Sequence, residues 1–155
     1  MPTFPLRQRP ALDYKTPPRS FGAVRDKGRR KHAGCDLYAP IGTEVLAVED
    51  GEIQGVVYPF YLGTYALEVR HASGIVRYGE IQRNTPREWK RGDRVSAGEV
   101  LGYIGQLQGL TVSMLHFELY SGTGDGPLTV RAGEFQRRDD LMDPTPFLDG
   151  CSIVG

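Results

Sequence analysis

The sequence contains little cysteine and no long apolar run. Its two cysteines, Cys35 and Cys151, are too few for the disulfide-dense scaffold of a small secreted protein, and their spacing leaves open whether they pair. No stretch approaches the roughly 20 apolar residues of a membrane span, and the N-terminus lacks the apolar segment of a signal peptide. We therefore expect no membrane span. The protein is expected to be cytoplasmic as synthesised, or to reach the periplasm or cell wall by a non-classical route.

The sequence also lacks an excess of charge of either sign. Its 19 basic and 19 acidic residues give a formal net charge of zero, so no nucleic-acid partner is expected. The one basic run, RDKGRRKH at 25–32, has no interleaved aromatic residues and is typical of a solvated loop. Phosphate-binding loops, dinucleotide-binding motifs and serine-nucleophile motifs are absent as well. These absences exclude the commonest nucleotide-dependent and serine-hydrolase classes.

What the sequence does contain is a succession of short β-type runs separated by glycine-containing turns. The expected runs lie at 44–50, 52–60, 65–71, 75–81, 92–105 and 112–120. No helix longer than two turns is expected, and LMDPTPFLDG near the C-terminus predicts a single helical turn. This spacing predicts an all-β fold with an antiparallel sheet or sandwich core and long loops.

Proline divides the chain unevenly. Five of the 11 prolines lie within residues 1–20, which predicts an extended N-terminal arm. This arm could be a docking segment for a larger assembly or a tail packed on its own domain. Residues 21–149 are expected to form the domain itself, and 150–155 a C-terminal tail.

One run combines a core face with chemistry-bearing side chains. In SMLHFELY, residues 113–120, alternation places Leu115, Phe117 and Leu119 on one face and His116 and Glu118 on the other. Earlier in the chain, His32 precedes Asp36 by four residues across a glycine-containing turn. Together with an imidazole from a neighbouring strand, such a pair would form an N/N/O set typical of a catalytic zinc site. The spacing alone also fits surface or core histidines.

The surroundings of these residues carry a family resemblance. The segments concerned are FGAVRDKGRRKHAGCDLYAPIGTEVLAVEDGEI, LEVRHASGIVRYGEI, GDRVSAGEVLGYIG, LHFEL and DPTPFL. In this order and spacing they resemble the lysostaphin/LytM-like zinc endopeptidases over residues 21–149. The resemblance implies that Zn²⁺ is bound by His32, Asp36 and His116. It also implies a place near the ligands for Glu118, which we expect to orient the His116 ring. The alternative for Glu118 is an exposed strand carboxylate, and His71 is expected to have no metal role.

The sequence also departs from the family pattern at two positions. Met114 stands where the family has the first histidine of an H-x-H motif, and Glu80 stands where it has the histidine of a Y-x-H segment. Both histidines that flank the metal are therefore replaced. A thioether cannot accept a proton at neutral pH or donate a hydrogen bond to an oxyanion.

Two interpretations of the enzyme follow, and the sequence does not choose between them. In the first, zinc activates a water molecule and Glu80 acts as general base in the hydrolysis of cell-wall peptide cross-links. Tyr78 or Tyr120 would then be the source of a donor for the oxyanion. In the second, the chain is a catalytically impaired pseudo-peptidase or a cell-wall peptide-binding module that retains structural zinc, with Glu80 as a fourth ligand. The expected partner in both is a peptidoglycan peptide or another glycine-rich peptide. The chain could also be part of a phage or secretion assembly.

Overall fold

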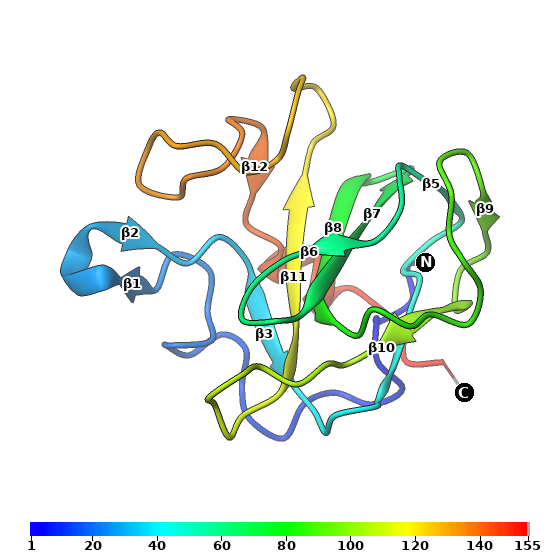
Figure 1. Ribbon diagram of the computed structural model, residues 1–155, viewed down its shortest axis with the longest axis horizontal. Helices are drawn as coiled ribbons and strands as arrows, with labels where there is room; N and C mark the ends of the chain where they lie inside the picture. The colour runs from blue at the N-terminus through cyan, green and yellow to red at the C-terminus, as the bar shows by residue number, and fades with distance from the viewer. Residues whose placement is uncertain (155) are drawn as a thin grey trace.

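The computed structural model describes residues 1–154 and is almost entirely β-structure (Figure 1). Its main feature is an antiparallel sheet of eight strands, in which β12, β11, β8, β7, β5 and β9 follow one another, β3 also pairs with β11 and β6 also pairs with β7. The strands are β3 (Cys35–Tyr38), β5 (Gly51–Ile53), β6 (Tyr58–Pro59), β7 (Tyr65–His71), β8 (Gly74–Ile81), β9 (Arg94–Val95), β11 (Met114–Tyr120) and β12 (Leu141–Met142). The expected all-β antiparallel class is confirmed.

The remaining elements are small. A second antiparallel pair joins β4 (Glu44–Leu46) to β10 (Val100–Tyr103). The hairpin of β1 (Val24–Arg25), the 3₁₀ turn η1 (Asp26–Gly28) and β2 (Arg30–Lys31) projects from the body, at the left in Figure 1. Helix α1 (Thr145–Asp149) follows Pro144, where one helical turn was predicted. Over residues 1–154, no helix has the length and apolar character needed to cross a membrane.

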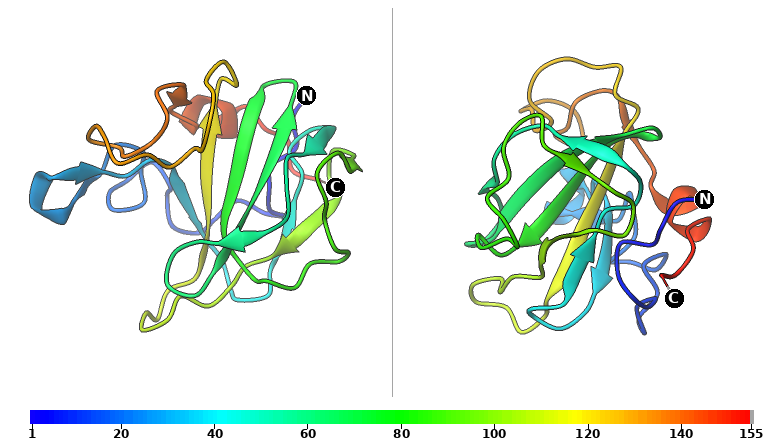
Figure 2. Two further views of the ribbon diagram at one scale, coloured as in Figure 1. Left: turned by 45° about the horizontal axis from the view of Figure 1, so that its top comes forward. Right: turned by 90° about the vertical axis from the view of Figure 1, so that its right-hand side faces the viewer.

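The hydrophobic core lies on one face of the large sheet. Leu115, Phe117 and Leu119 are at most 3% exposed, as the alternation of this strand predicts. Val45 of β4 and Leu101 of β10 join the same core cluster, so the small sheet contributes to the core on this side of the large one. Figure 2 shows the large sheet from two further directions. The opposite face of β11 carries the polar side chains of His116 and Glu118.

The prediction of a single strand over 52–60 is wrong. Strand β5 ends at Ile53 and β6 does not begin until Tyr58. Gly55 lies in the gap, and Val56 is 61% exposed, so this segment leaves the sheet. The apolar run resembled a strand, but glycine has no side chain with which to hold a sheet position.

Residues 1–20 lie against the domain and carry part of its core. Phe4, Leu6 and Tyr14 are buried, and the Phe4 N–H donates to the Ser152 carbonyl at 2.8 Å. The two termini lie on the same side of the molecule (Figure 1). The division into an arm (1–20), a domain (21–149) and a tail (150–155) stays a prediction, and these contacts favour a packed arm.

Candidate metal centre

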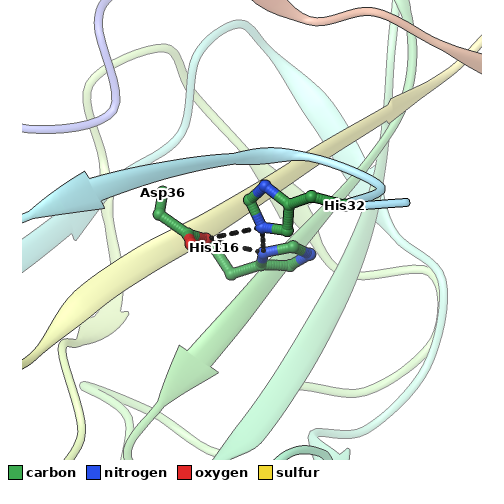
Figure 3. Close-up of side chains that lie close together, drawn as sticks. All are labelled: His32, Asp36 and His116. Atoms are coloured by element: carbon green, nitrogen blue, oxygen red, sulfur yellow. Dashed lines mark hydrogen bonds and ion pairs between the residues drawn. The ribbon is translucent and has the colours of Figure 1, made fainter. Parts of the chain in front are cut away.

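The register of β11 places His116 and Asp36 side by side. Strand β11 lies between β3 and β8, and His116 pairs with Asp36 on one side and with Gly79 on the other. Directly opposed residues of antiparallel strands point to the same face. The two side chains therefore meet on the face away from the core (Figure 3).

His32 reaches this point from the loop between β2 and β3. The loop runs close to β11 at Gly34, where an added Cβ would lie 2.4 Å from the Phe117 carbonyl oxygen. His32 Nδ1 lies 3.0 Å from the Ser20 carbonyl oxygen. A carbonyl only accepts hydrogen bonds, so Nδ1 carries a proton, and Nε2 faces the other two side chains.

The three side chains form a tight cluster of possible ligand atoms. Asp36 Oδ1 lies 3.1 Å from His32 Nε2 and 2.9 Å from His116 Nδ1, and the two nitrogens are 3.3 Å apart. All three residues are buried, and their ligand atoms lie within 4.8 Å of one another. Two imidazole nitrogens and one carboxylate oxygen match the donor set of catalytic zinc sites. The structure thus brings together the residues predicted as ligands, and they fit such an ion.

The protonation of the cluster follows from its contacts. Burial alone would raise the pKa of Asp36, but hydrogen bonds from His116 and His32 outweigh it and lower the pKa to about 2. Burial alone would lower the pKa of His116, but hydrogen bonds to Asp36 and Glu118 raise it to about 10. At neutral pH, without a cation, His116 is therefore protonated on both nitrogens. A metal ion would have to displace the proton on Nδ1.

Glu118 holds the other side of the His116 ring. Its side chain is 0% exposed, so the alternative of an exposed strand carboxylate is wrong. Glu118 Oε2 lies 2.6 Å from His116 Nε2 and accepts its proton in a hydrogen bond. Burial would raise the pKa of Glu118, but the charge of Arg77 and the hydrogen bond to His116 bring it well below the usual range. A permanent carboxylate here orients the ring with Nδ1 toward Asp36.

Two arginines compensate the buried charge of Glu118. Arg77 donates to Oε1 through Nε at 3.0 Å, and Arg137 donates to Oε2 through Nε at 3.0 Å. Tyr120 donates its hydroxyl to Oε1 at 2.6 Å. Neither arginine was predicted from the sequence as part of the site. The available signal was Arg77 itself, a charged residue inside the otherwise mostly apolar strand GIVRYGEI.

Glu80 occupies an irregular position on β8. The register with β7 shifts between Tyr65 and Leu67, so that Gly79 and Glu80 lie opposite one residue, as in a β-bulge. Glu80 has a φ of 65°, and its Oε2 is buried with no hydrogen-bond partner among residues 1–154. Burial raises the pKa of Glu80 to about 7, although the charge of His116 opposes the shift. Glu80 is thus a buried carboxyl that can exchange a proton near neutrality.

The other residues considered in the sequence analysis lie outside the ligand cluster. Tyr78 uses its hydroxyl on the core side, 2.9 Å from His71 Nε2, and Tyr120 is committed to Glu118. The suggestion that either tyrosine supplies an oxyanion donor is therefore wrong. His71 is buried, and its Nδ1 lies 3.1 Å from the Asp50 carbonyl oxygen. Met114 is 5% exposed and stands on the His116 face without an acid–base group.

Cys35 and Cys151 are both buried free thiols. Burial raises the pKa of each to about 11. The pairing that the sequence left open is therefore not present in the structure.

Comparison with known proteins identifies relatives of this chain among the cell-wall endopeptidases. The chain is 34% identical over 109 residues to the peptidoglycan DD-endopeptidase ShyC of Vibrio cholerae, a match that covers 69% of this chain and 24% of ShyC. It is 27% identical over 117 residues to the glycyl-glycine endopeptidase ALE-1 of Staphylococcus capitis, covering 76% of this chain and 29% of ALE-1. The chain thus spans about a quarter of the length of these relatives.

The fold is shared with a solved structure. The catalytic domain of lysostaphin from Staphylococcus simulans superposes with a TM-score of 0.62 at 24% identity, over 84% of this chain and 90% of that domain. The sequence model described as Peptidase family M23 matches residues 30–127, which include the three clustered side chains. On this match, the chain with its all-β fold and its His–Asp–His cluster belongs to peptidase family M23.

Proposed function

We propose that this chain is a zinc-dependent endopeptidase domain directed at peptidoglycan peptides. His32, Asp36 and His116 hold the ion, and Glu80 is the general base. The observation that carries the proposal is the cluster itself: three buried ligand atoms of the right types within 4.8 Å of one another. The charges of His116 and Asp36 also act on the buried carboxyl of Glu80, whose Oε2 has no partner among residues 1–154.

The division of work follows from the chemistry of each group. A zinc ion supplies a Lewis acid that polarises the peptide carbonyl and acidifies water. Glu80 takes the proton of the attacking water and returns it to the departing amine nitrogen, as the C–O bond forms and the C–N bond breaks. In the metal-free protein, burial raises the pKa of Glu80 to about 7, and a nearby cation would lower it and so favour the carboxylate that accepts the proton. Glu118 keeps His116 in the tautomer that the ion requires.

The substrate class is inferred from the relatives. ShyC is a peptidoglycan DD-endopeptidase and ALE-1 a glycyl-glycine endopeptidase, so both act on peptide bonds of the kinds expected here. A cell-wall peptide is the substrate we propose, with a glycine-rich cross-link as the second form to test. Family membership supports hydrolysis of this class, and the replacement of two histidines by Met114 and Glu80 makes turnover the property to measure.

A second candidate function rests on the same unpaired oxygen. Glu80 Oε2 could bind the ion as a fourth ligand, which would close the coordination sphere and make the site structural. The chain would then be a catalytically impaired pseudo-peptidase or a cell-wall peptide-binding module. The two candidates differ in whether Glu80 moves protons or binds metal.

One experiment separates them. Zinc-loaded protein is incubated with purified peptidoglycan or pentaglycine, and new amino groups are measured beside Glu80→Gln and His116→Ala. The peptidase proposal expects release by the wild type and by neither variant, with zinc still bound to Glu80→Gln. An inert wild type that holds one equivalent of zinc, and binds it much less tightly after Glu80→Gln, would establish the structural site instead.

A further inference from the structure

Arg25 stands beside the metal centre, outside the ligand set. It lies at the end of β1, in the hairpin that projects from the body (Figure 1). Its Nη2 is 3.7 Å from Asp36 Oδ2, and its side chain is 23% exposed. Nη2 also donates to the Pro18 carbonyl at 2.7 Å. The guanidinium is thus held at the edge of the centre, partly open to solvent.

The two oxygens of Asp36 face different groups. Oδ1 faces His32 and His116, whereas Oδ2 faces Arg25. At 3.7 Å the contact with Arg25 is an ion pair and too long for a hydrogen bond. Across residues 1–154 the guanidinium makes one side-chain hydrogen bond, to Pro18, and arginine has five N–H donors. Most of its donors are therefore uncommitted next to the ligand cluster.

The other nearby guanidiniums are already engaged. Arg77 and Arg137 both bind Glu118, on the Nε2 side of the His116 ring. Arg25 stands beside Asp36, which pairs with the other ring nitrogen, Nδ1. Its charge also reaches Glu80, because it opposes the upward shift of the Glu80 pKa that burial causes. The positive charge of Arg25 therefore acts both on the ligand cluster, through Asp36, and on Glu80, the proposed base.

A peptidase at this centre would use such a positive charge to stabilise the negative charge that develops on the substrate. Hydrolysis of an amide places negative charge on the carbonyl oxygen, and one donor to that oxygen typically contributes ~10²–10³ in rate. Met114 cannot donate, and the hydroxyls of Tyr78 and Tyr120 are committed. We propose that Arg25 binds a negatively charged oxygen of the ligand at this centre. The assignment rests on the proposed function, since it names the partner of the same site.

The test uses inorganic phosphate as the anionic probe on the full chain loaded with cobalt(II), whose absorption spectrum reports its ligands. The variants are Arg25→Met, Arg25→Lys and the matched control Arg29→Met from the same hairpin. We expect phosphate to bind about tenfold or more weakly to Arg25→Met, with partial recovery in Arg25→Lys and wild-type affinity in Arg29→Met. Cobalt affinity should be the same in all four proteins.

Two results would overturn the assignment. Unchanged phosphate affinity in Arg25→Met would show that the guanidinium does not meet the anion. A parallel loss of cobalt affinity would show that Arg25 acts by holding Asp36. Neither measurement requires turnover. An inert wild type would therefore refute the proposed peptidase function, and the phosphate affinities of the variants would still decide the role of Arg25.

Kinetic measurements on two peptide substrates show which group of the ligand carries the charged oxygen. If it is the oxyanion, Arg25→Met lowers kcat equally for peptides with a free and with an amidated C-terminus. If it is a carboxylate of the ligand, KM rises for the free acid and stays constant for the amide. Equal kcat and KM for wild type and Arg25→Met on both peptides would count against the assignment.

Discussion

His116 and Glu118 share a hydrogen bond of 2.6 Å between Nε2 and Oε2, and this contact turns the opposite ring nitrogen, Nδ1, toward Asp36. The two residues lie two positions apart on β11, so both side chains point away from the core. The strand thus supplies both the imidazole that we propose as a zinc ligand and the carboxylate that orients it. The first prediction follows from this pair.

Replacing Glu118 by Gln should weaken zinc binding by about 10–100-fold, because an amide holds the Nε2 proton less strongly and leaves the ring free to turn. Competition with a chromophoric chelator measures the affinity. Glu134→Gln is the matched control, since Glu134 pairs with Lys31 on the exposed hairpin at 3.2 Å. Equal affinities in wild type and Glu118→Gln, both folded by circular dichroism, would contradict the orienting role.

Zinc uptake should depend on pH because the ion and a proton compete for His116 Nδ1. The pKa of His116 in the metal-free protein is raised to about 10, so each binding event below that pH releases a proton. The apparent affinity should therefore rise about tenfold per pH unit for this one group. Isothermal titration in buffers of different ionisation enthalpy counts the protons. Uptake without proton release at pH 7 would be inconsistent with this ligand.

The same pKa predicts how the metal-free protein responds to alkali. The folded pKa of His116 lies above the ordinary histidine value of 6.5, so the protonated ring contributes stability that is complete below pH 6.5. That contribution is lost as the pH rises toward 10. Chemical denaturation of metal-free protein at pH 6 and pH 9 measures the difference, and His116→Gln should remove most of it. A larger stability at pH 9 would contradict the shift.

Restoring a histidine at position 114 should raise turnover. Met114 is buried on the same face of β11 as His116, and an imidazole in its place would add an acid–base group, which typically contributes ~10²–10⁴ in rate. The measurement is kcat on the peptide substrate for Met114→His. Met114→Leu, which conserves volume, is the control and should leave the rate unchanged. Equal rates in all three proteins would show that Glu80 already supplies the proton transfers.

Gly34 should be essential to the placement of His32. An added methyl group would lie 2.4 Å from the Phe117 carbonyl oxygen, so Gly34→Ala must push the loop off β11 at about 1–3 kcal/mol. Both the melting temperature and the zinc affinity should fall. Gly55→Ala is the control, because nothing lies within 4 Å of its added Cβ. A Gly34→Ala protein that matches wild type in both would rule out the close approach.

Much of the fold was predictable because its signals are local. The alternation of Leu115 and Phe117 predicted the core face of β11, and the proline before α1 predicted the helical turn. The strand expected over 52–60 failed because an apolar run does not reveal where the chain leaves a sheet. Sheet edges depend on pairing with distant strands, which a single segment does not encode.

The candidate site was predictable in part for the same reason. His32 and Asp36 are near neighbours in the chain, and the resemblance supplied His116. The burial of Glu118 could not be inferred, because the charges that permit it come from Arg77, 41 residues earlier, and Arg137, 19 residues later. Arg25 was hidden in a basic run that resembled a solvated loop. Its position relative to Asp36 follows only from the three-dimensional path of the hairpin.

The Ser20 carbonyl, at the end of the N-terminal arm, accepts a hydrogen bond from His32, and the neighbouring Arg19 carbonyl accepts one from the Asp36 N–H at 2.9 Å. If the proposed ion binds, its binding and the docking of this segment are expected to favour each other by the same free energy. Cation occupancy should slow proteolytic trimming of this segment. Sequence changes in the segment could in turn tune metal retention without altering any ligand.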